Sequence, residues 1–240
     1  MLHFSLPEPA ATLVTLGLLV IPIILLIAFV FGHYNADRTR RTIKPLRLST
    51  SWVLVVCAWI IFAASTTLRT PALLIALGMT CGAIGDLVLA NVLPLPQRMI
   101  SGIIVFSIGH LCYIAAFSQT ASVLGLNDPF SGSLLWVAFV IVAAFLWFFL
   151  IYNPAKSHAL NIGSLFYGWL IAIMAGTAAA LALAEPRFTL TAIGGVLFLT
   201  SDIILGNREL RDNGWFLVHD VVWVLYIAGQ ALIVLTTTLV

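Results

Sequence analysis

Long apolar runs, separated by short polar or proline-containing segments, are the dominant pattern of this chain. A run of roughly 20 apolar residues is long enough to cross the hydrocarbon core of a bilayer as an α-helix. Eight such runs occur, so the pattern predicts eight transmembrane helices. We expect these helices at residues 10–31, 48–68, 71–92, 99–117, 133–151, 162–184, 188–206 and 216–236.

The composition supports this reading. Hydrophobic residues make up 62% of the 240 residues and charged residues 8%, with a mean hydropathy of +1.12. Soluble domains carry about 25% charged residues. The chain is therefore predicted to be an all-α integral membrane protein, with residues 1–240 in a single transmembrane domain. The first run has full spanning length and follows no basic region, which indicates a first helix rather than a cleaved signal peptide.

The lysines and arginines fall on alternate connections. Nine lie in the connections after the first, third, fifth and seventh runs, whereas only Arg69 and Arg187 lie on the other side. The positive-inside rule then predicts a multi-pass protein of the cell (plasma) membrane with both termini outside the cytoplasm. This topology explains the net charge of +2 better than a nucleic-acid partner does, so no nucleic acid is expected.

One segment occurs twice in near-copy. Residues 85–91 read Gly-Asp-Leu-Val-Leu-Ala-Asn, and residues 201–207 read Ser-Asp-Ile-Ile-Leu-Gly-Asn. A weaker correspondence links residues 108–111 with residues 228–231. We interpret these copies as two parallel four-helix repeats related by a pseudo-two-fold axis along the membrane normal, chance resemblance being the alternative. The repeats would cover residues 10–118 and 133–237.

Each copy places one carboxylate, Asp86 or Asp202, inside an apolar run. An ionised carboxylate that faces hydrocarbon costs at least about 2.5 kcal/mol, so such a residue normally faces a protein-lined or water-filled interior. The pseudo-two-fold axis would bring both acids to one depth at a shared midline. Asp86 and Asp202 are therefore the first candidates for chemistry.

Helical spacing aligns aromatic and polar side chains near these acids. We interpret His110 and Tyr226 as polar lining of the interior, because lipid offers such groups no hydrogen-bond partner; aromatic packing is the alternative. His219 and Asp220 lie at the predicted membrane boundary, where solvation explains them. The two stripes are Phe106, His110, Tyr113 and Phe117 in the fourth run, and His219, Trp223, Tyr226 and Gln230 in the eighth.

Two carboxyl groups in one low-dielectric site can differ in protonation, so that one is an acid and the other a base. That division suits cleavage of an ether or acetal-like bond through an oxocarbenium-type species. Ser201 or Ser107 with His110 could supply a nucleophile, but no nucleophile-elbow pattern appears. A metal held by Asp86, Asp202 and His110 would lack the HExxH pair. We therefore predict neither metal nor cofactor.

Several short motifs, each in the right order, resemble the YhhN-like lysoplasmalogenase family from about residue 44 to residue 233. They are Lys44-Pro45-Leu46, Gly85-Asp86, His110-Leu111-Cys112-Tyr113, the pair Tyr167 and Met174, residues 198–202, and Gln230.

Members of that family are multi-pass membrane hydrolases of lipid metabolism that cleave the vinyl ether bond of lysoplasmalogens. The products are a fatty aldehyde and a glycerophospho-base. The resemblance implies a lysophospholipid substrate taken from the bilayer, with Asp86 and Asp202 sharing proton transfer and water activation. Lys44 has the right charge for a lipid phosphate, although it is equally explained as a positive-inside residue. Binding or positioning roles fall to Lys44, His110, Tyr113, Tyr167, Ser201, Tyr226 and Gln230.

Two other classes of function fit the same pattern. A small multi-pass transporter could use its intramembrane aspartates for proton or substrate coupling, although no proline-interrupted helix occurs at corresponding positions of the halves. A scaffold or lipid-binding protein could hold the acids as structural partners of Tyr and His. The sequence leaves the oligomeric state open.

Overall fold

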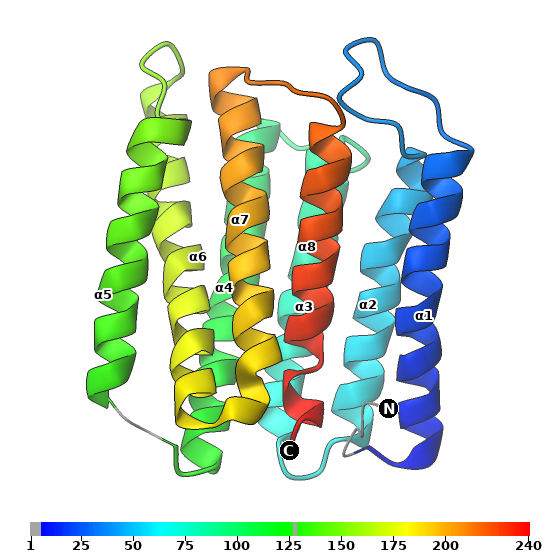
Figure 1. Ribbon diagram of the computed structural model, residues 1–240, viewed down its shortest axis with the longest axis vertical. Helices are drawn as coiled ribbons and strands as arrows, with labels where there is room; N and C mark the ends of the chain where they lie inside the picture. Colours follow the sequence, from blue (N-terminus) through cyan, green and yellow to red (C-terminus); the bar gives the residue numbers. More distant parts are fainter. Residues whose placement is uncertain (1–5, 127–128) are drawn as a thin grey trace.

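The computed structural model describes residues 6–126 and 129–240, and this part of the chain is helical, with no strand. Eight helices are long and apolar enough to cross a membrane, which confirms the predicted number (Figure 1). They are α1 (Glu8–Val30), α2 (Lys44–Ala64), α3 (Arg69–Leu89), α4 (Arg98–Val123), α5 (Pro129–Leu146), α6 (His158–Ala184), α7 (Thr189–Arg211) and α8 (Val218–Val234). A π-helical turn, Trp147–Ile151, continues α5, and 3₁₀ turns at Pro186–Phe188 and Thr236–Thr238 precede α7 and follow α8.

The helices run up and down in one bundle, with α1 and α5 at its two sides and α8 near the middle (Figure 1). Because α1 and α5 each pack mainly on one neighbour, they are the least buried spans, whereas α3 and α8 are the most buried. The connections 31–43, 90–97, 152–157 and 212–217 lie together at one end, which we call the basic end. The start of α1 and the end of α8 lie at the other. The placement of the basic end in the cytoplasm stays a prediction.

Several helices, among them α2, α4, α6 and α7, extend at least four residues beyond their predicted apolar runs. Helix α2 begins at Lys44, four residues before the predicted start, because Pro45 has the fixed φ that suits a first helical turn. Helix α4 continues to Val123, six residues past the predicted end. The apolar pattern marks the part of a helix that needs an apolar environment, whereas backbone hydrogen bonding continues the helix through polar residues.

Glycine pairs set two of the closest helix contacts. A Cβ atom on Gly109 of α4 would lie 3.0 Å from the carbonyl oxygen of Gly78 on α3. A Cβ atom on Gly229 of α8 would lie 2.8 Å from the carbonyl oxygen of Gly194 on α7. Such small residues let two helices approach at backbone distance. Gly78 and Gly194 each precede a candidate aspartate by eight residues. The correspondence agrees with a duplication, but the two-repeat arrangement stays a prediction.

Replacing Gly194 by Ala should lower the free energy of unfolding of the detergent-solubilised protein by about 1–3 kcal/mol, which a lower thermal unfolding temperature would report. The reason is that the new Cβ atom meets backbone that cannot move locally. The control is Gly163→Ala in α6, where a Cβ atom meets nothing within 4 Å, so that the variant should be as stable as the wild type or slightly more so. Equal thermal stability of the two variants would contradict close α7–α8 packing at Gly194.

Candidate active site

A pocket of about 380 Å³ lies at the basic end of the bundle. Helices α2, α3, α4, α6, α7 and α8 all contribute to its wall, so it belongs to the bundle as a whole. Both candidate aspartates line it. The apolar part of the pocket wall includes Leu89, Ile103, Phe106, Ile171, Leu199 and Leu205.

Asp86 lies near the end of α3 and is buried, with 6% of its surface exposed. Its Oδ2 atom accepts hydrogen bonds from Ser51 Oγ of α2 at 2.5 Å and from the Tyr226 hydroxyl of α8 at 2.9 Å. Phe106 of α4 packs against the preceding Gly85, where a side chain would collide with the ring. Three neighbouring helices therefore fix the position of this carboxyl group.

Asp202 lies on α7 and is more accessible than Asp86. The Tyr167 hydroxyl of α6 donates to its Oδ2 atom at 2.5 Å, and Ser201 Oγ donates to its Oδ1 atom at 3.1 Å. Ser201 is fully buried, and its single hydroxyl hydrogen is shared between the Phe198 carbonyl at 2.7 Å and Asp202 Oδ1, so it supports Asp202 from behind and does not line the pocket.

The two carboxyl groups have matching surroundings. Each accepts hydrogen bonds from one tyrosine and one serine, and among the described residues neither belongs to an ion pair. Hydroxyl groups can support a carboxylate and can also rotate to accept from a protonated carboxyl. A carboxyl group held by hydroxyl groups and outside any close ion pair can hold or release a proton during a reaction.

A series of hydrogen-bonded side chains lies behind Asp86. The Tyr113 hydroxyl donates to Gln230 Oε1 at 2.7 Å, and Gln230 Nε2 donates to the Tyr226 hydroxyl oxygen at 3.3 Å. Tyr226 lines the pocket, whereas Tyr113 and Gln230 do not. The structure thus brings these predicted residues together, with Tyr113 and Gln230 oriented to hold Tyr226.

His110 is 1% exposed and lies outside the pocket wall. Its ring packs edge-on against Phe198 at 4.7 Å between centroids and lies 5.6 Å from the ring of Tyr167. Within the described part of the chain, neither ring nitrogen has a hydrogen-bond partner. His110 therefore supports the Tyr167 side of the site by packing.

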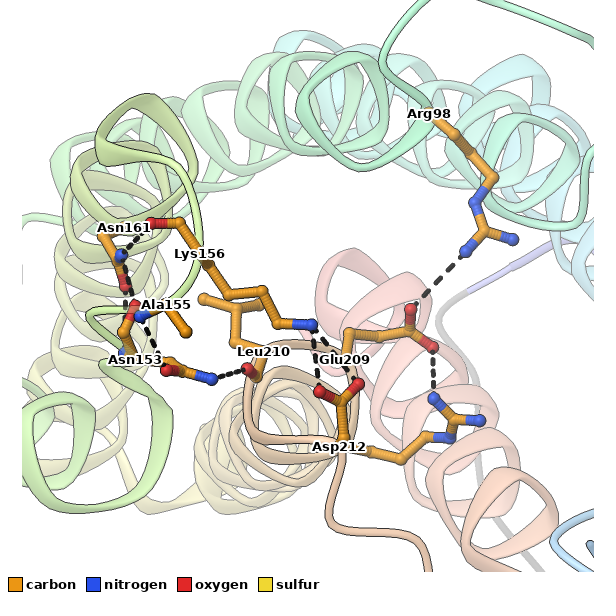
Figure 2. Close-up of polar contacts among 9 residues, drawn as sticks. Arg98, Asn153, Ala155, Lys156, Asn161, Glu209, Leu210 and Asp212 are labelled. Atoms are coloured by element: carbon orange, nitrogen blue, oxygen red, sulfur yellow. Dashed lines mark hydrogen bonds and ion pairs between the residues drawn. The ribbon is translucent and has the colours of Figure 1, made fainter.

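Basic side chains gather at the outer rim of the pocket, on the first or last turns of the helices and in the connection before α2. Lys44, predicted to face a lipid phosphate, does line the pocket. Figure 2 shows Arg98, from the start of α4, reaching across to Glu209 on α7. That carboxylate also pairs with Arg208 at 3.3 Å. The basic residues of the rim are Arg40, Lys44, Arg47, Arg98, Arg208 and His219.

Comparison with known protein families shows which family this chain belongs to. The model of the YhhN family matches residues 45–237. This chain belongs to the YhhN family. Neither the comparison with curated proteins nor that with solved structures gave a match. The match confirms the predicted resemblance and covers every residue of the site except Arg40 and Lys44.

In this YhhN-family protein, two residues of the site were missed in the sequence. Ser51 and Arg47 lie one helical turn apart on α2, and each contributes to the pocket or to Asp86. A signal existed, because Ser49-Thr50-Ser51 interrupts the apolar run of α2. Arg47 was counted only among the basic residues of a connection, since the predicted helix began one residue after it.

The interpretation of Asp220 as a solvated boundary residue is wrong. Asp220 is 6% exposed and accepts hydrogen bonds from Arg41 N at 2.6 Å, from Thr42 N at 3.2 Å and from Thr42 Oγ1 at 2.5 Å. Backbone bonds from Leu217 and His219 to the same connection reinforce this contact. The connection 31–43 is thereby tied to the start of α8, which holds the beginning of α2 at the pocket rim.

The connection 152–157 is tied to the end of α7 in a similar way (Figure 2). Asn153 Nδ2 donates to the Leu210 carbonyl at 2.6 Å, and Lys156 Nζ pairs with Asp212 at 3.0 Å. Both connections therefore fix helix ends that carry rim residues.

Among the residues described, no group of three or more His, Cys, Asp or Glu side chains could hold a metal ion. Asp86, Asp202 and His110 thus do not form the metal cluster that was considered from the sequence. His110 is separated from the pocket by the rings around it.

Replacing Asp220 by Ala should lower the free energy of unfolding by about 2–4 kcal/mol, because two backbone N–H groups and one hydroxyl lose a charged acceptor. Thermal unfolding and limited proteolysis within residues 31–43 would measure the loss. Asp37→Ala, an exposed acid in the same connection, should stay within about 0.5 kcal/mol of the wild type. Wild-type stability of the Asp220 variant would rule out the tether.

Proposed function

We propose that this protein is a membrane hydrolase that cleaves the vinyl ether bond of lysoplasmalogens, releasing a fatty aldehyde and a glycerophospho-base. The observation that carries the proposal is the pair Asp86 and Asp202, which face one pocket from different helices, free of ion pairs and each oriented by a tyrosine and a serine. Family membership and the basic rim support it.

The reaction needs one proton donor and one proton acceptor. The carboxylic acid of the pair transfers its proton to the outer carbon of the O–CH=CH group, and the double-bond electrons form the new C–H bond. The resulting oxocarbenium ion is attacked by water, which gives a proton to the carboxylate of the pair. The product of this step is a hemiacetal.

The hemiacetal then breaks its bond to the glycerol oxygen. Its hydroxyl proton passes to a carboxylate while the glycerol oxygen receives a proton from the other carboxyl group, so the pair returns to its starting state. One water is consumed, and one aldehyde and one alcohol are formed. Asp86 and Asp202 divide these roles, while Tyr226 and Tyr167 hold the carboxyl oxygens in place.

The shape and charge of the pocket suit a single-chain phospholipid. Its apolar wall accommodates the alkenyl chain, and its basic rim attracts a phosphate. Under the proposed orientation in the cell membrane, the basic end faces the cytoplasm and the lipid enters from the inner leaflet. Lys44 would contribute to phosphate binding, and His110, Tyr113, Ser201 and Gln230 would position the groups that touch substrate and water.

The geometry favours hydrolysis over transport with proton or substrate coupling. Transporter sites are typically built where helices are unwound at mid-membrane. Here α3 and α7 continue as regular helices through Asp86 and Asp202. In gradient-free liposomes, an enzyme produces aldehyde from lysoplasmalogen, whereas a transporter moves solute and produces none.

Asp86→Asn and Asp202→Asn should each lower aldehyde release by at least about 100-fold in purified protein, because an amide neither donates nor accepts the transferred proton. Asp37→Asn, which changes an exposed acid in the connection 31–43, should retain wild-type turnover. Equal thermal stability of all three variants would show that the loss is chemical. Wild-type activity in either Asp86→Asn or Asp202→Asn would exclude the acid–base pair.

In D₂O, the aldehyde should carry one deuterium at carbon 2, because the first proton goes to the outer alkenyl carbon. A saturated 1-O-alkyl lysolipid should release nothing, since it has no alkenyl carbon to protonate. Mass spectrometry of the aldehyde measures both. Cleavage of the saturated ether, or an aldehyde without deuterium, would contradict the proposed chemistry.

A further inference from the structure

Arg47 is a buried cation that, among the described residues, belongs to no ion pair, although Asp220 and Asp86 act on it electrostatically at longer range. It is 9% exposed and lines the pocket. Its Nε atom has no hydrogen-bond partner, and none of the ion pairs among the described residues includes it. By contrast, Arg98 and Arg208 of the same rim share the carboxylate of Glu209.

Packing holds Arg47 in this position. Its guanidinium carbon lies 4.8 Å from the centre of the Trp223 ring. Trp223 is itself fixed, because its indole nitrogen donates to Thr50 Oγ1 at 3.2 Å. A planar guanidinium stacked on an aromatic ring keeps its edge available for a planar or tetrahedral anion.

A buried charge without a partner destabilises a protein, so a purely structural arginine would be expected to pair with a carboxylate or with backbone carbonyls. The two carboxylates that act on Arg47 at longer range are instead held by other groups: Asp220 by Arg41 and Thr42, and Asp86 by Ser51 and Tyr226. Arg47 therefore lines the pocket with no anion of the described residues at ion-pair distance from it.

The position of Arg47 along α2 relates it to the acid pair. Ser51, which donates to Asp86, lies four residues further along the same helix. Four residues of α-helix rise about 6 Å. In a glycerophospholipid, five single bonds separate the phosphorus from the ether oxygen at the other end of the glycerol, which is roughly 6 Å when extended. An anion at Arg47 would therefore place that ether bond near Asp86.

We propose that Arg47 is the anchor for the phosphate ester of the ligand, with Trp223 holding its guanidinium and Lys44 and Arg40 as outer, more hydrated contributors. The chemistry recognised is a glycerophosphate ester, carried either by a lysophospholipid or by a soluble glycerophosphodiester. Delivery of a vinyl ether to the acid pair rests on the proposed function, whereas phosphate binding at Arg47 does not.

Binding is tested on the full-length detergent-solubilised protein by ligand-dependent thermal shift. The ligands are acyl lysophosphatidylethanolamine, a monoacylglycerol with the same chain, and glycerophosphoethanolamine. Arg47→Met should raise the Kd for lysophosphatidylethanolamine at least tenfold and change the Kd for the monoacylglycerol much less. Arg38→Gln, which removes an exposed charge from the adjacent connection, should leave both unchanged.

The unliganded Arg47→Met protein should unfold at the same temperature as the wild type or higher, since an uncompensated charge has been removed. If Arg47 were merely structural, Arg47→Met would unfold at a lower temperature and keep the wild-type Kd for lysophosphatidylethanolamine. That result would overturn the proposal. If the Met variant does not fold, Arg47→Lys, which keeps the charge but not the planar fork, should show an intermediate rise in Kd. A wild-type Kd in the Lys variant would then overturn it.

The two ligand sources give separate results. Stabilisation of the wild type by glycerophosphoethanolamine, lost in Arg47→Met, supports a subsite for the soluble ester as well. Stabilisation by lysophosphatidylethanolamine alone supports the lipid as the source. Failure of both ligands to stabilise the wild type, or equal stabilisation of Arg47→Met, overturns the phosphate anchor.

Kinetics distinguish this proposal from the proposed function. If the wild type releases aldehyde, the ratio of kcat/KM for lysoplasmalogen to that for the corresponding 1-O-alkenylglycerol should fall at least tenfold in Arg47→Met, mainly through KM. An unchanged ratio would contradict the anchor. If the wild type releases no aldehyde, the proposed function fails, while the binding measurements still decide whether Arg47 holds phosphate.

Discussion

Burial of two carboxyl groups in an apolar bundle, neither of them in an ion pair among the described residues, is the constraint on which the site depends. A carboxylate in a low-dielectric interior is costly unless hydrogen bonds replace its hydration. In this protein those bonds come from hydroxyl groups on other helices: Ser51 and Tyr226 for Asp86, and Tyr167 for Asp202. Satisfying the acids therefore connects α2, α3 and α8 on one side and α6 with α7 on the other. The hydrogen bonds that offset the cost of burying the two carboxyl groups also fix the positions of these groups.

Close helix packing makes these short contacts possible. Glycines at the α3–α4 and α7–α8 interfaces bring the backbones together two helical turns from each aspartate. Since the hydrogen bonds to the acids span neighbouring helices, small changes in helix separation would open them. The lipid-facing α1 and α5 contribute little to this core. Stability and site geometry thus depend on the central helices, which are also the most buried.

Charge is separated along the bundle axis. The cations lie on the outermost turns at the basic end, and the acids lie deeper, bound by hydroxyls. Glu209 pairs with two cations of the rim, whereas Arg47 is in none of the ion pairs among the described residues. The ligand that we propose, with one phosphate and one long apolar chain, would complement this arrangement, because its phosphate would meet the basic rim and its ether bond would reach the acids. The tether from Asp220 to the connection before α2 keeps the rim in place.

The sequence by itself determined the fold class, because the length and composition of apolar runs decide whether a helix can lie in a bilayer. It also indicated the two candidate acids, since a carboxylate inside such a run avoids a large desolvation cost only by facing a polar interior. Only the tertiary structure decided which groups meet those acids. Ser51, Arg47 and Asp220 come from helices or connections distant in the chain, and whether each side chain faces the pocket depends on helix rotation and on contacts between segments. Tyr113, His110 and Gln230 had the right spacing, yet they lie behind the pocket wall. Periodicity gives the face of a helix, whereas the distance of that face from a cavity is set by the neighbouring helices.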